Sequence, residues 1–246
     1  MDRGLYVSMT GAKQIMQAQA VNNHNIANVN TVGFRADTVS FDSEPIYGPG
    51  YATRVNAVAS DAGTDLSSGV LTSTGRSLDI AVNGAGFIAV QGADGKEAYT
   101  RAGDLQVTAD GAVTTSTGLP VLSESGPIVI PPATTVTIGG DGTISVVPQG
   151  LAPAAQSQVD RIKLVNPARG SLTKGDDGLL RLKTGAKATT DEAVKVSSGT
   201  LESSNVNAAQ SLVSMIELQR LYEFQIKSIN SSDTNEQSAE RMMLAS

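Results

Sequence analysis

Apolar residues recur at helical spacing at both ends of the chain, whereas the middle shows no such period. The first stripe, within residues 5–28, follows a heptad-like alternation and comprises Leu5, Met9, Ala12, Met16, Gln19, Asn23 and Ile26. The second, within residues 208–244, comprises Leu212, Met215, Gln219, Tyr222, Ile226 and Ile229, thickened by Ile216, Leu218, Leu221 and Phe224. This spacing predicts two amphipathic helices whose apolar faces are buried against each other or against neighbouring subunits.

Short β-type runs alternate with turns in the middle of the chain. The runs include residues 80–82, 87–90, 128–130 and 144–147, and four Asp-Gly pairs supply the positive φ angles that tight hairpins require. Residues 36–75 lack a clear period and contain several Pro and Gly residues, which is typical of an extended connection or a loose β-ribbon.

We therefore expect an α+β multidomain chain. A central all-β domain is expected at residues 76–200, preceded by the linker or β-ribbon of residues 36–75. Residues 1–35 and 205–246 are expected to form a discontinuous, coiled-coil-like helical domain, in which the two ends of the chain pair. Two helical ends with nothing local to pack on favour a subunit that polymerises over a catalytic domain.

Composition narrows the function further. The 246 residues include no Trp and only 4% aromatic residues, which argues against a large aromatic-lined pocket for a small-molecule substrate. A formal net charge of -6 argues against nucleic-acid binding, and the absence of Cys excludes zinc sites of the Cys type. No stretch approaches the ~18 apolar residues of a membrane span. We expect no metal, no cofactor and no membrane span.

Catalytic motifs are weak or missing. Residues 83–89 form a degenerate dinucleotide fingerprint, but a β-type run follows where that motif needs a helix, so a glycine pair at a bend is the better interpretation. A Ser-His-Asp arrangement would have to use His24, the single histidine, in the Asn-rich end of the first helix. Arg76, Arg101 and Arg161 are interpreted as surface or ion-pairing residues. The chain is therefore not expected to be an enzyme.

Specific segments resemble one known family. Residues 22–35, Asn-Asn-His-Asn-Ile-Ala-Asn-Val-Asn-Thr-Val-Gly-Phe-Arg, closely resemble the N-terminal signature of bacterial flagellar rod and hook proteins. Residues 74–87 and 99–103 resemble the entrance to the family's β domain. Residues 199–207 resemble the segment that leads into its C-terminal helix, and residues 217–223 match the best-marked heptad of that helix.

The resemblance implies a structural subunit of the flagellar basal-body rod, the drive shaft that crosses the periplasm. Residues 1–12 look most like the proximal-rod members, and a distal-rod or other axial subunit is the alternative within the family. The implied partners are other rod proteins and the flagellar type III export apparatus, in keeping with the lack of an evident Sec-type signal peptide. Outside the family, the alternative is a secreted β-domain module of a fibre or binding protein.

The subunit interface is expected on the helices. Its apolar candidates are Leu5, Met9, Ala12, Met16, Leu212, Met215, Tyr222, Ile226 and Ile229. Asn22, Asn23 and Asn28 are expected to fix the end of the first helix and the turn out of it, either at the interface or as caps within one subunit. Removal of residues 1–35 is then expected to abolish assembly and to leave the β domain folded.

Overall fold

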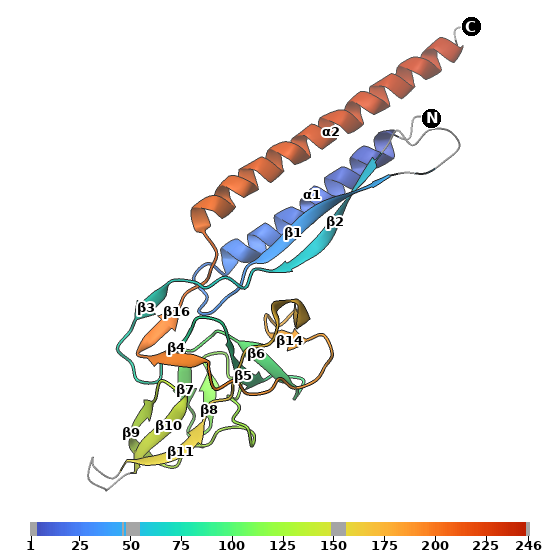
Figure 1. Ribbon diagram of the computed structural model, residues 1–246. Coiled ribbons are helices and arrows are strands. Elements are labelled where there is room, and N and C mark those ends of the chain that lie inside the picture. The colour runs from blue at the N-terminus through green and yellow to red at the C-terminus, as the bar shows by residue number, and fades with distance from the viewer. Residues whose placement is uncertain (1–3, 46, 48–54, 149–155, 245–246) are drawn as a thin grey trace. The chain divides into compact units, whose positions relative to one another are not determined.

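The computed structural model describes residues 4–45, 47, 55–148 and 156–244. These residues belong to two compact units (Figure 1). Unit 1 comprises residues 1–27, 37–65 and 206–246, and unit 2 comprises residues 28–36 and 66–205. The chain therefore passes from one unit to the other four times, after residues 27, 36, 65 and 205.

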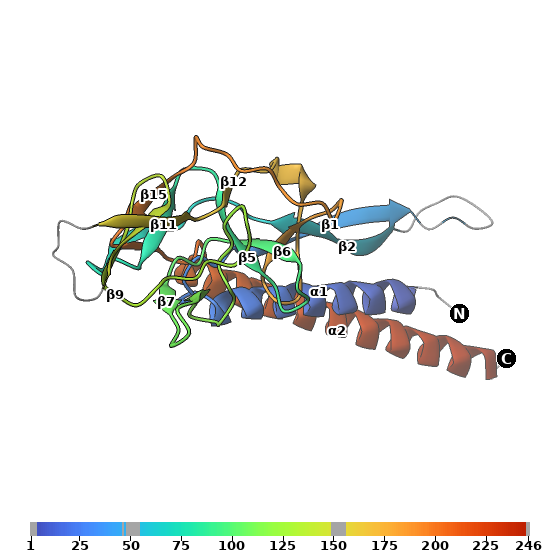
Figure 2. The ribbon, with the colours of Figure 1, turned by 90° about the horizontal axis from the view of Figure 1, so that it is seen from below.

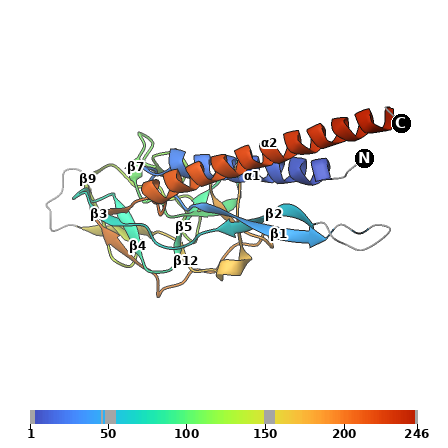
Figure 3. The ribbon, with the colours of Figure 1, turned by 90° about the horizontal axis from the view of Figure 1, so that it is seen from above.

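Unit 1 contains two long helices and one β-hairpin. Helix α1 spans Gly4–Ala27 and helix α2 spans Ala208–Leu244, close to the ranges that the apolar stripes predict. Strands β1 (Asp37–Pro45) and β2 (Val55–Thr64) pair antiparallel, and both contact α1 (Figure 3). The register shifts between Thr38 and Val39, which marks a bulge near the start of the hairpin.

The two helices of unit 1 lie side by side and run antiparallel (Figure 2). The amide Nδ2 of Asn22 donates to the carbonyl oxygen of Ser211 at 2.8 Å, and the hydroxyls of Ser8 and Ser228 lie 3.1 Å apart near the other end of the pair. The buried residues of α1 are Gly11, Ala12, Ile15, Ala18 and Asn25. Gly11 lies against the Gln225 side chain of α2, and because it has no side chain of its own the two helices can approach closely there.

The inward face of α2 is rotated relative to the stripe expected from the sequence. No residue of this helix is fully buried within the described chain. Its half-buried positions include a series with four-three spacing, which comprises Ser211, Met215, Leu218, Tyr222, Gln225 and Ile229. Met215, Tyr222 and Ile229 of the expected stripe are therefore on this face, whereas Leu212 and Ile226 are exposed.

Unit 2 is built of short antiparallel strands. The strands are β3 (Leu71–Ser73), β4 (Ile80–Asn83), β5 (Phe87–Gln91), β6 (Glu97–Thr100), β7 (Leu105–Val107), β8 (Val113–Thr115), β9 (Ala133–Ile138), β10 (Thr143–Pro148), β11 (Ser157–Arg161), β12 (Leu164–Val165), β13 (Leu172–Lys174), β14 (Leu180–Leu182), β15 (Lys195–Ser198) and β16 (Thr200–Glu202). A 3₁₀ turn spans Arg169–Ser171. The five-stranded sheet has the order β12-β5-β6-β14-β13, the three-stranded sheet has the order β11-β10-β9, and β15-β4, β16-β3 and β7-β8 form pairs.

Strand β5 separates two apolar clusters, because successive side chains of a strand point to opposite faces. Ile88 and Val90 belong to the larger cluster, and Phe87 and Ala89 belong to the smaller one. The larger cluster also contains residues of β4, β7 and β10, which are buried on the inner faces of their sheets. Burial on both faces explains why residues 87–90 form a continuous apolar run rather than an alternating one.

The observed elements confirm an α+β chain with a predominantly β central part. The four Asp-Gly pairs all lie in turns in which the glycine has a positive φ angle. The expectation of a strand at residues 128–130 is wrong, because this segment forms isolated bridges such as the one between Ala112 and Val129. Pro127 and Pro131 flank the segment and lack the N–H donors that would extend a ladder.

The compact units also divide the chain at other points than the expected domains. Residues 37–65, within the expected linker, form the hairpin of unit 1. Residues 28–36, within the expected helical domain, belong to unit 2. The segment that follows α1 is thus part of the β-rich unit.

Candidate functional site

The predicted interface residues divide into inward and outward sets. The half-buried ones are Leu5, Asn22, Met215, Tyr222 and Ile229, and Ala12 is buried. The exposed ones are Met9, Met16, Asn23, Leu212 and Ile226, with about half of each of Met9, Met16 and Leu212 accessible. Asn28 is half-buried and belongs to unit 2, where its backbone carbonyl accepts a hydrogen bond from the N–H of Thr31 at 3.2 Å. Only the first set is therefore turned away from water, and Asn22 of this set makes a hydrogen bond from α1 to α2.

Helix α2 carries further apolar side chains on its outer surface. Leu212, Ile216 and Phe224 are exposed, with 66% of Phe224 accessible. Together with Arg220 they are spaced four residues apart, so they form one row along the helix surface. Exposed apolar residues that gather along one row mark an interaction surface more strongly than scattered ones do. The expected stripe included several of them but was too broad to separate the inner face from the outer one.

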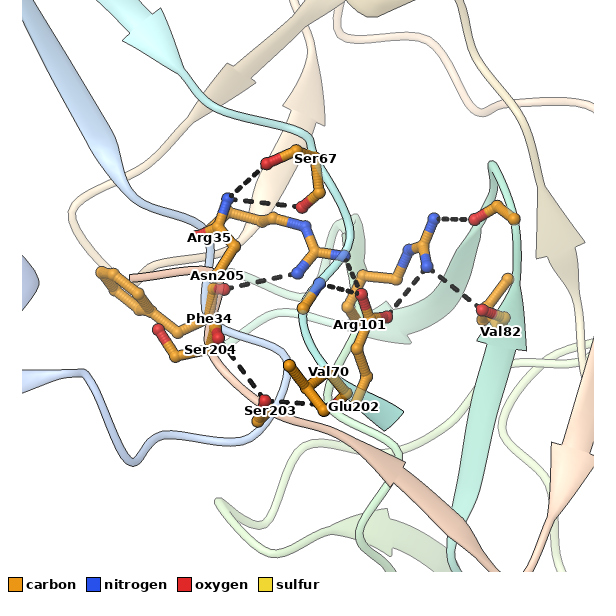
Figure 4. A network of polar contacts seen from close by, with 12 residues as sticks. Phe34, Arg35, Ser67, Val70, Val82, Arg101, Glu202, Ser203, Ser204 and Asn205 are labelled. Carbon is orange, nitrogen blue, oxygen red and sulfur yellow. Dashed lines mark hydrogen bonds and ion pairs between the residues drawn. The ribbon is translucent and has the colours of Figure 1, made fainter. Parts of the chain in front are cut away.

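A buried ion triad lies in unit 2, at the C-terminal end of β16. Glu202 is fully buried, and its Oε1 accepts a hydrogen bond from Nη2 of Arg35 at 2.6 Å (Figure 4). Its Oε2 accepts from Nη1 of Arg101 at 2.9 Å. The side chains of both arginines are 3% exposed. The N–H of Gly69 donates a further hydrogen bond to Oε1 at 2.8 Å.

Backbone hydrogen bonds join three segments around this triad. The N–H of Gly33 donates to the carbonyl of Glu202 at 2.8 Å, and the N–H of Ser203 donates to the carbonyl of Val70 at 2.9 Å. Residues 33–36, 67–70 and 202–205 are thereby held to one another (Figure 4). We name these three segments, together with the triad of Arg35, Arg101 and Glu202, the clasp.

Asn205 completes the clasp with its side-chain amide. Its Oδ1 accepts from the N–H of Ala36 at 2.8 Å, and its Nδ2 donates to the carbonyl of Ser67 at 3.3 Å. Lys174 adds a contact from β13, because its Nζ donates to the carbonyl of Arg35 at 2.8 Å and lies 4.1 Å from the centre of the Phe34 ring. Each segment of the clasp therefore has more than one partner.

The clasp contains one more positive charge than negative charges. Burial lowers the pKa of Arg101, the nearby Arg35 charge lowers it further, and the Glu202 carboxylate opposes both effects. The carbonyls of Val82 and Gly84 accept hydrogen bonds from Arg101, and the ring of Phe87 lies 5.2 Å from its guanidinium carbon. These dipoles and the aromatic face stabilise the surplus charge.

Only part of this arrangement could be predicted from the sequence. Arg101 was expected to lie at the surface or in an ion pair, and the structure confirms the ion pair, whereas Arg35 and Glu202 were included only as members of longer motifs. Arg35 and Glu202 are 167 residues apart in the chain, so no local spacing relates them. The one sequence signal for this ion pair was that Arg35 and Glu202 each lie within a segment that resembles the family.

A second buried ion pair joins Glu97 of β6 to Lys163, which directly precedes β12. Nζ of Lys163 lies 2.8 Å and 2.9 Å from the two carboxylate oxygens of Glu97. The hydroxyl of Tyr99 donates to Glu97 at 3.0 Å and accepts from the N–H of Ala188 at 2.7 Å. Burial raises the pKa of the Tyr99 hydroxyl to about 12, and the Glu97 charge adds to this rise. Every group has a structural partner, so the cluster is part of the core.

The remaining chemical candidates have structural roles. Gly84 and Gly86 lie at the bend between β4 and β5, and a strand follows them, which confirms the bend interpretation of residues 83–89. Nδ1 of His24 lies 3.4 Å from a carboxylate oxygen of Asp37. Within the described residues, no group of three or more acidic or histidine side chains is arranged to hold a metal ion.

The described part of the chain also contains a groove in unit 2, between the β7–β8 turn and β9. Its volume is about 590 Å³, and Asp110 is the one charged residue among the described residues that line it. A lone carboxylate offers no partner for acid–base chemistry. None of the described helices has the length and apolar character needed to cross a membrane.

Two family models match this chain. The model described as the flagellar hook protein FlgE/F/G D1 domain matches residues 81–146, which run from β4 into β10. The model described as the flagellar basal body rod FlgEFG protein C-terminal matches residues 197–242, which include β16, Asn205 and most of α2. The second match therefore covers Glu202 and the outer row of α2.

Full-length relatives match as well. The chain is 39% identical to the flagellar basal-body rod protein FlgF of Salmonella typhimurium strain LT2, over 99% of both chains. It is also 39% identical to FlgF of Escherichia coli strain K12, again over 99% of both chains. It is 35% identical to the rod protein FlgG of Buchnera aphidicola subsp. Acyrthosiphon pisum, over 93% of this chain and 95% of the relative.

Proposed function

Because this chain belongs to the family of flagellar basal-body rod proteins and is a structural subunit of the rod, we propose that it occupies the proximal rod. The 39% identity to two FlgF proteins over nearly the whole chain supports this position. The 35% identity to a FlgG protein supports a second candidate, another position along the same rod.

We propose that the outer faces of α1 and α2 are the surfaces on which neighbouring subunits pack. The single observation that carries this proposal is the exposed apolar row of Leu212, Ile216 and Phe224 on α2. On α1, Met9 and Met16 are seven residues apart and about half exposed, so they lie on one face of that helix. Packing against neighbouring helices in a coiled-coil-like manner would remove these side chains from water.

The inward residues have a different proposed role. Ala12, Met215, Tyr222 and Ile229 hold α1 and α2 together within one subunit, and Asn22 fixes the pair through its hydrogen bond to Ser211. The predicted interface set thus separates into contacts within the subunit and contacts between subunits. A repeated contact between unlike surfaces that does not close on itself builds an open helical tube, which a rod requires.

The mechanism that follows is mechanical. Torque passes from subunit to subunit through many packed helix faces, so rigidity comes from the total buried area. Such a subunit has other rod proteins as partners and needs no cofactor, metal or substrate, and it is not an enzyme. We propose that it reaches the rod in the periplasm through the flagellar type III export apparatus.

An outward-facing substitution tests the interface. We expect Ile216→Asp to abolish rod assembly, because a carboxylate in a dry helix contact loses its hydration without gaining a partner. The purified monomer is expected to change its free energy of unfolding by less than about 0.5 kcal/mol, because Ile216 is half exposed there. Assembly is measured by soft-agar motility and by the yield of rods in isolated basal bodies from a strain that carries only the variant.

Ile216→Met is the matched control, because it keeps an apolar side chain of similar volume, and it should preserve motility. Full motility in the Ile216→Asp strain would contradict the proposed interface.

Deletions from the N-terminus should end at residue 27, since removal of residues 1–35 would also remove Arg35 and Gly33 from unit 2. Deletion of residues 1–27 is expected to stop assembly and to leave the clasp intact.

A further inference from the structure

Glu202 is the last of the three charged clasp residues in chain order. It follows Arg35 by 167 residues and Arg101 by 101 residues. We infer that residues 33–36 join unit 2 only when the Glu202 carboxylate is in place. We call this dependence the lock. The chain thereby makes the anchoring of an early segment depend on a late one.

The charge balance of the clasp supports this dependence of residues 33–36 on Glu202. With Glu202 present, the two guanidinium groups share one carboxylate in a space where all three side chains are at most 3% exposed. Without it, the same space would hold two positive charges and no negative one. A buried charge that loses its partner is strongly destabilising, so one arginine must return to water.

Arg35 is the arginine that leaves, because its other contacts are poorer. Apart from Glu202, its guanidinium donates only one hydrogen bond among the described residues, a long one of 3.4 Å to the carbonyl of the adjacent Phe34. Arg101 keeps the carbonyls of Val82 and Gly84, as well as the Phe87 ring. Release of the Arg35 guanidinium removes the ion pair of residues 33–36, which then depend on the hydrogen bonds of Gly33 and Ala36 alone and open more readily.

The clasp can open locally because it lies outside both apolar clusters. None of residues 33–36, 67–70 or 202–205 is a member of either cluster. Segments with few buried apolar contacts open at lower free energy than the core strands do. The sheets that contain β5 and β6 therefore remain folded while the clasp is open.

Closure has a consequence for the chain exits of unit 2. Residues 36, 66 and 205 are each adjacent to a point at which the chain leaves the unit or enters it. The clasp ties these three exits together through Arg35, Gly69 and Asn205. One carboxylate thus controls whether three exits of unit 2 are fixed.

Hydrogen exchange of the full-length chain with Glu202→Gln tests the lock. We expect amides of residues 28–36 and 67–70 to exchange roughly 100-fold faster or more, as the loss of a buried partner implies. Amides of β5 and β6 should change by less than about threefold. Glu97→Gln is the matched control, because it breaks the buried pair with Lys163 in the same unit but touches no clasp segment.

The control should accelerate exchange near β6 and leave residues 28–36 unchanged. Equal acceleration throughout unit 2 in Glu202→Gln would overturn the lock, and so would unchanged exchange at residues 28–36. If Glu202→Gln does not fold, Arg35→Gln serves instead, since it leaves Glu202 paired with Arg101. That variant should release residues 28–36 selectively, and protection equal to that of the unmodified chain would overturn the inference.

A double variant tests whether the surplus positive charge destabilises the clasp when Glu202 is absent. Arg35→Met added to Glu202→Gln restores the net charge of the clasp to that of the unmodified chain. We expect exchange at residues 67–70 in the double variant to be slower than in Glu202→Gln alone, because the repulsion between the two arginines is gone. Equal exchange in both variants would overturn the role assigned to charge.

Discussion

The side-chain amide of Asn25 hydrogen-bonds both backbone polar groups of Asp37. Its Nδ2 donates to the Asp37 carbonyl at 2.8 Å, and its Oδ1 accepts from the Asp37 N–H at 2.9 Å. The Asn25 amide thus bonds the backbone of Asp37, at the start of β1, as a residue of a neighbouring strand would. Asn25 is buried on α1, so this contact joins the helix to the hairpin within unit 1.

Asn25→Ala should destabilise unit 1 by about 2–3 kcal/mol, because it leaves the N–H and carbonyl of Asp37 without their partners. Urea unfolding followed by circular dichroism measures the loss. Asn23→Ala is the control, since Asn23 is exposed on the same helix and gains the same helix propensity on substitution. Equal stability of the two variants would contradict the role of the amide.

Gly33 has a positive φ angle of 67° and lies against the backbone of Arg101 and Ala102 in the same unit. A Cβ at this position would overlap the backbone nitrogen of Ala102 and the carbonyl carbon of Arg101. We expect Gly33→Ala to lower the free energy of unfolding by more than about 3 kcal/mol, since backbone cannot move aside cheaply. Thermal unfolding of the purified chain measures the loss.

Gly75→Ala separates backbone strain from overlap at Gly33. Gly75 has a similar φ angle of 72°, but a Cβ added to it would meet no atom within 4 Å in the described structure. Its substitution should cost only the strain of a left-handed residue, about 1–2 kcal/mol. A loss at Gly33 no larger than that at Gly75 would refute the close contact.

Gly11 lies where α1 meets α2. A Cβ there would lie 3.2 Å from Cδ of Gln225, the end of a flexible side chain that can shift. Gly11→Ala should therefore be neutral or stabilise the chain by up to about 1 kcal/mol, through the higher helix propensity of Ala. Gly11→Leu should lose at least about 2 kcal/mol, because the helices must separate. Urea titration with circular dichroism detection compares the two, and similar stabilities would show that the helices are not in close contact.

The Tyr99 hydroxyl gives a pH dependence to the stability of unit 2. Its pKa is raised to about 12 in the folded chain, chiefly by burial, so the folded state holds this proton more tightly than the unfolded state does. The resulting stability is fully present below about pH 10 and is lost as the pH rises towards 12. The difference in tyrosinate absorbance between the unmodified chain and Tyr99→Phe should titrate near pH 12. A midpoint near the model-peptide value of about 10 would contradict the burial of this hydroxyl.

Local patterns were sufficient for the secondary structure of much of the chain. The expected helices agree with α1 and α2 to within a residue or two, because apolar residues at three- and four-residue spacing have no comparable β arrangement. The Asp-Gly pairs identified turns because glycine alone tolerates the positive φ angle that these turns require. The family-like segments at residues 99–103 and 217–223 also lie in the regions that the family models match.

The inner and outer faces of the helices could not be separated from the stripes alone. Met9 and Met16 are exposed, whereas the smaller Ala12 and Ala18 are buried. A stripe that is apolar over a wide arc fits several rotations of the helix, and the shape of the partner surface selects one of them. Small residues are buried here because α2 and the hairpin approach the α1 backbone closely.

The helices, the turns and the family follow from the order of amino acids, since each depends on residues that are neighbours in the chain. Folding in three dimensions was needed to bring Arg35, Arg101 and Glu202 into one buried site and Asn25 onto the backbone of Asp37. Ion pairs and hydrogen bonds depend on distances in space, not on positions in the chain. Residues separated by 101 or 167 positions acquire such distances only when the strands and connections between them have folded.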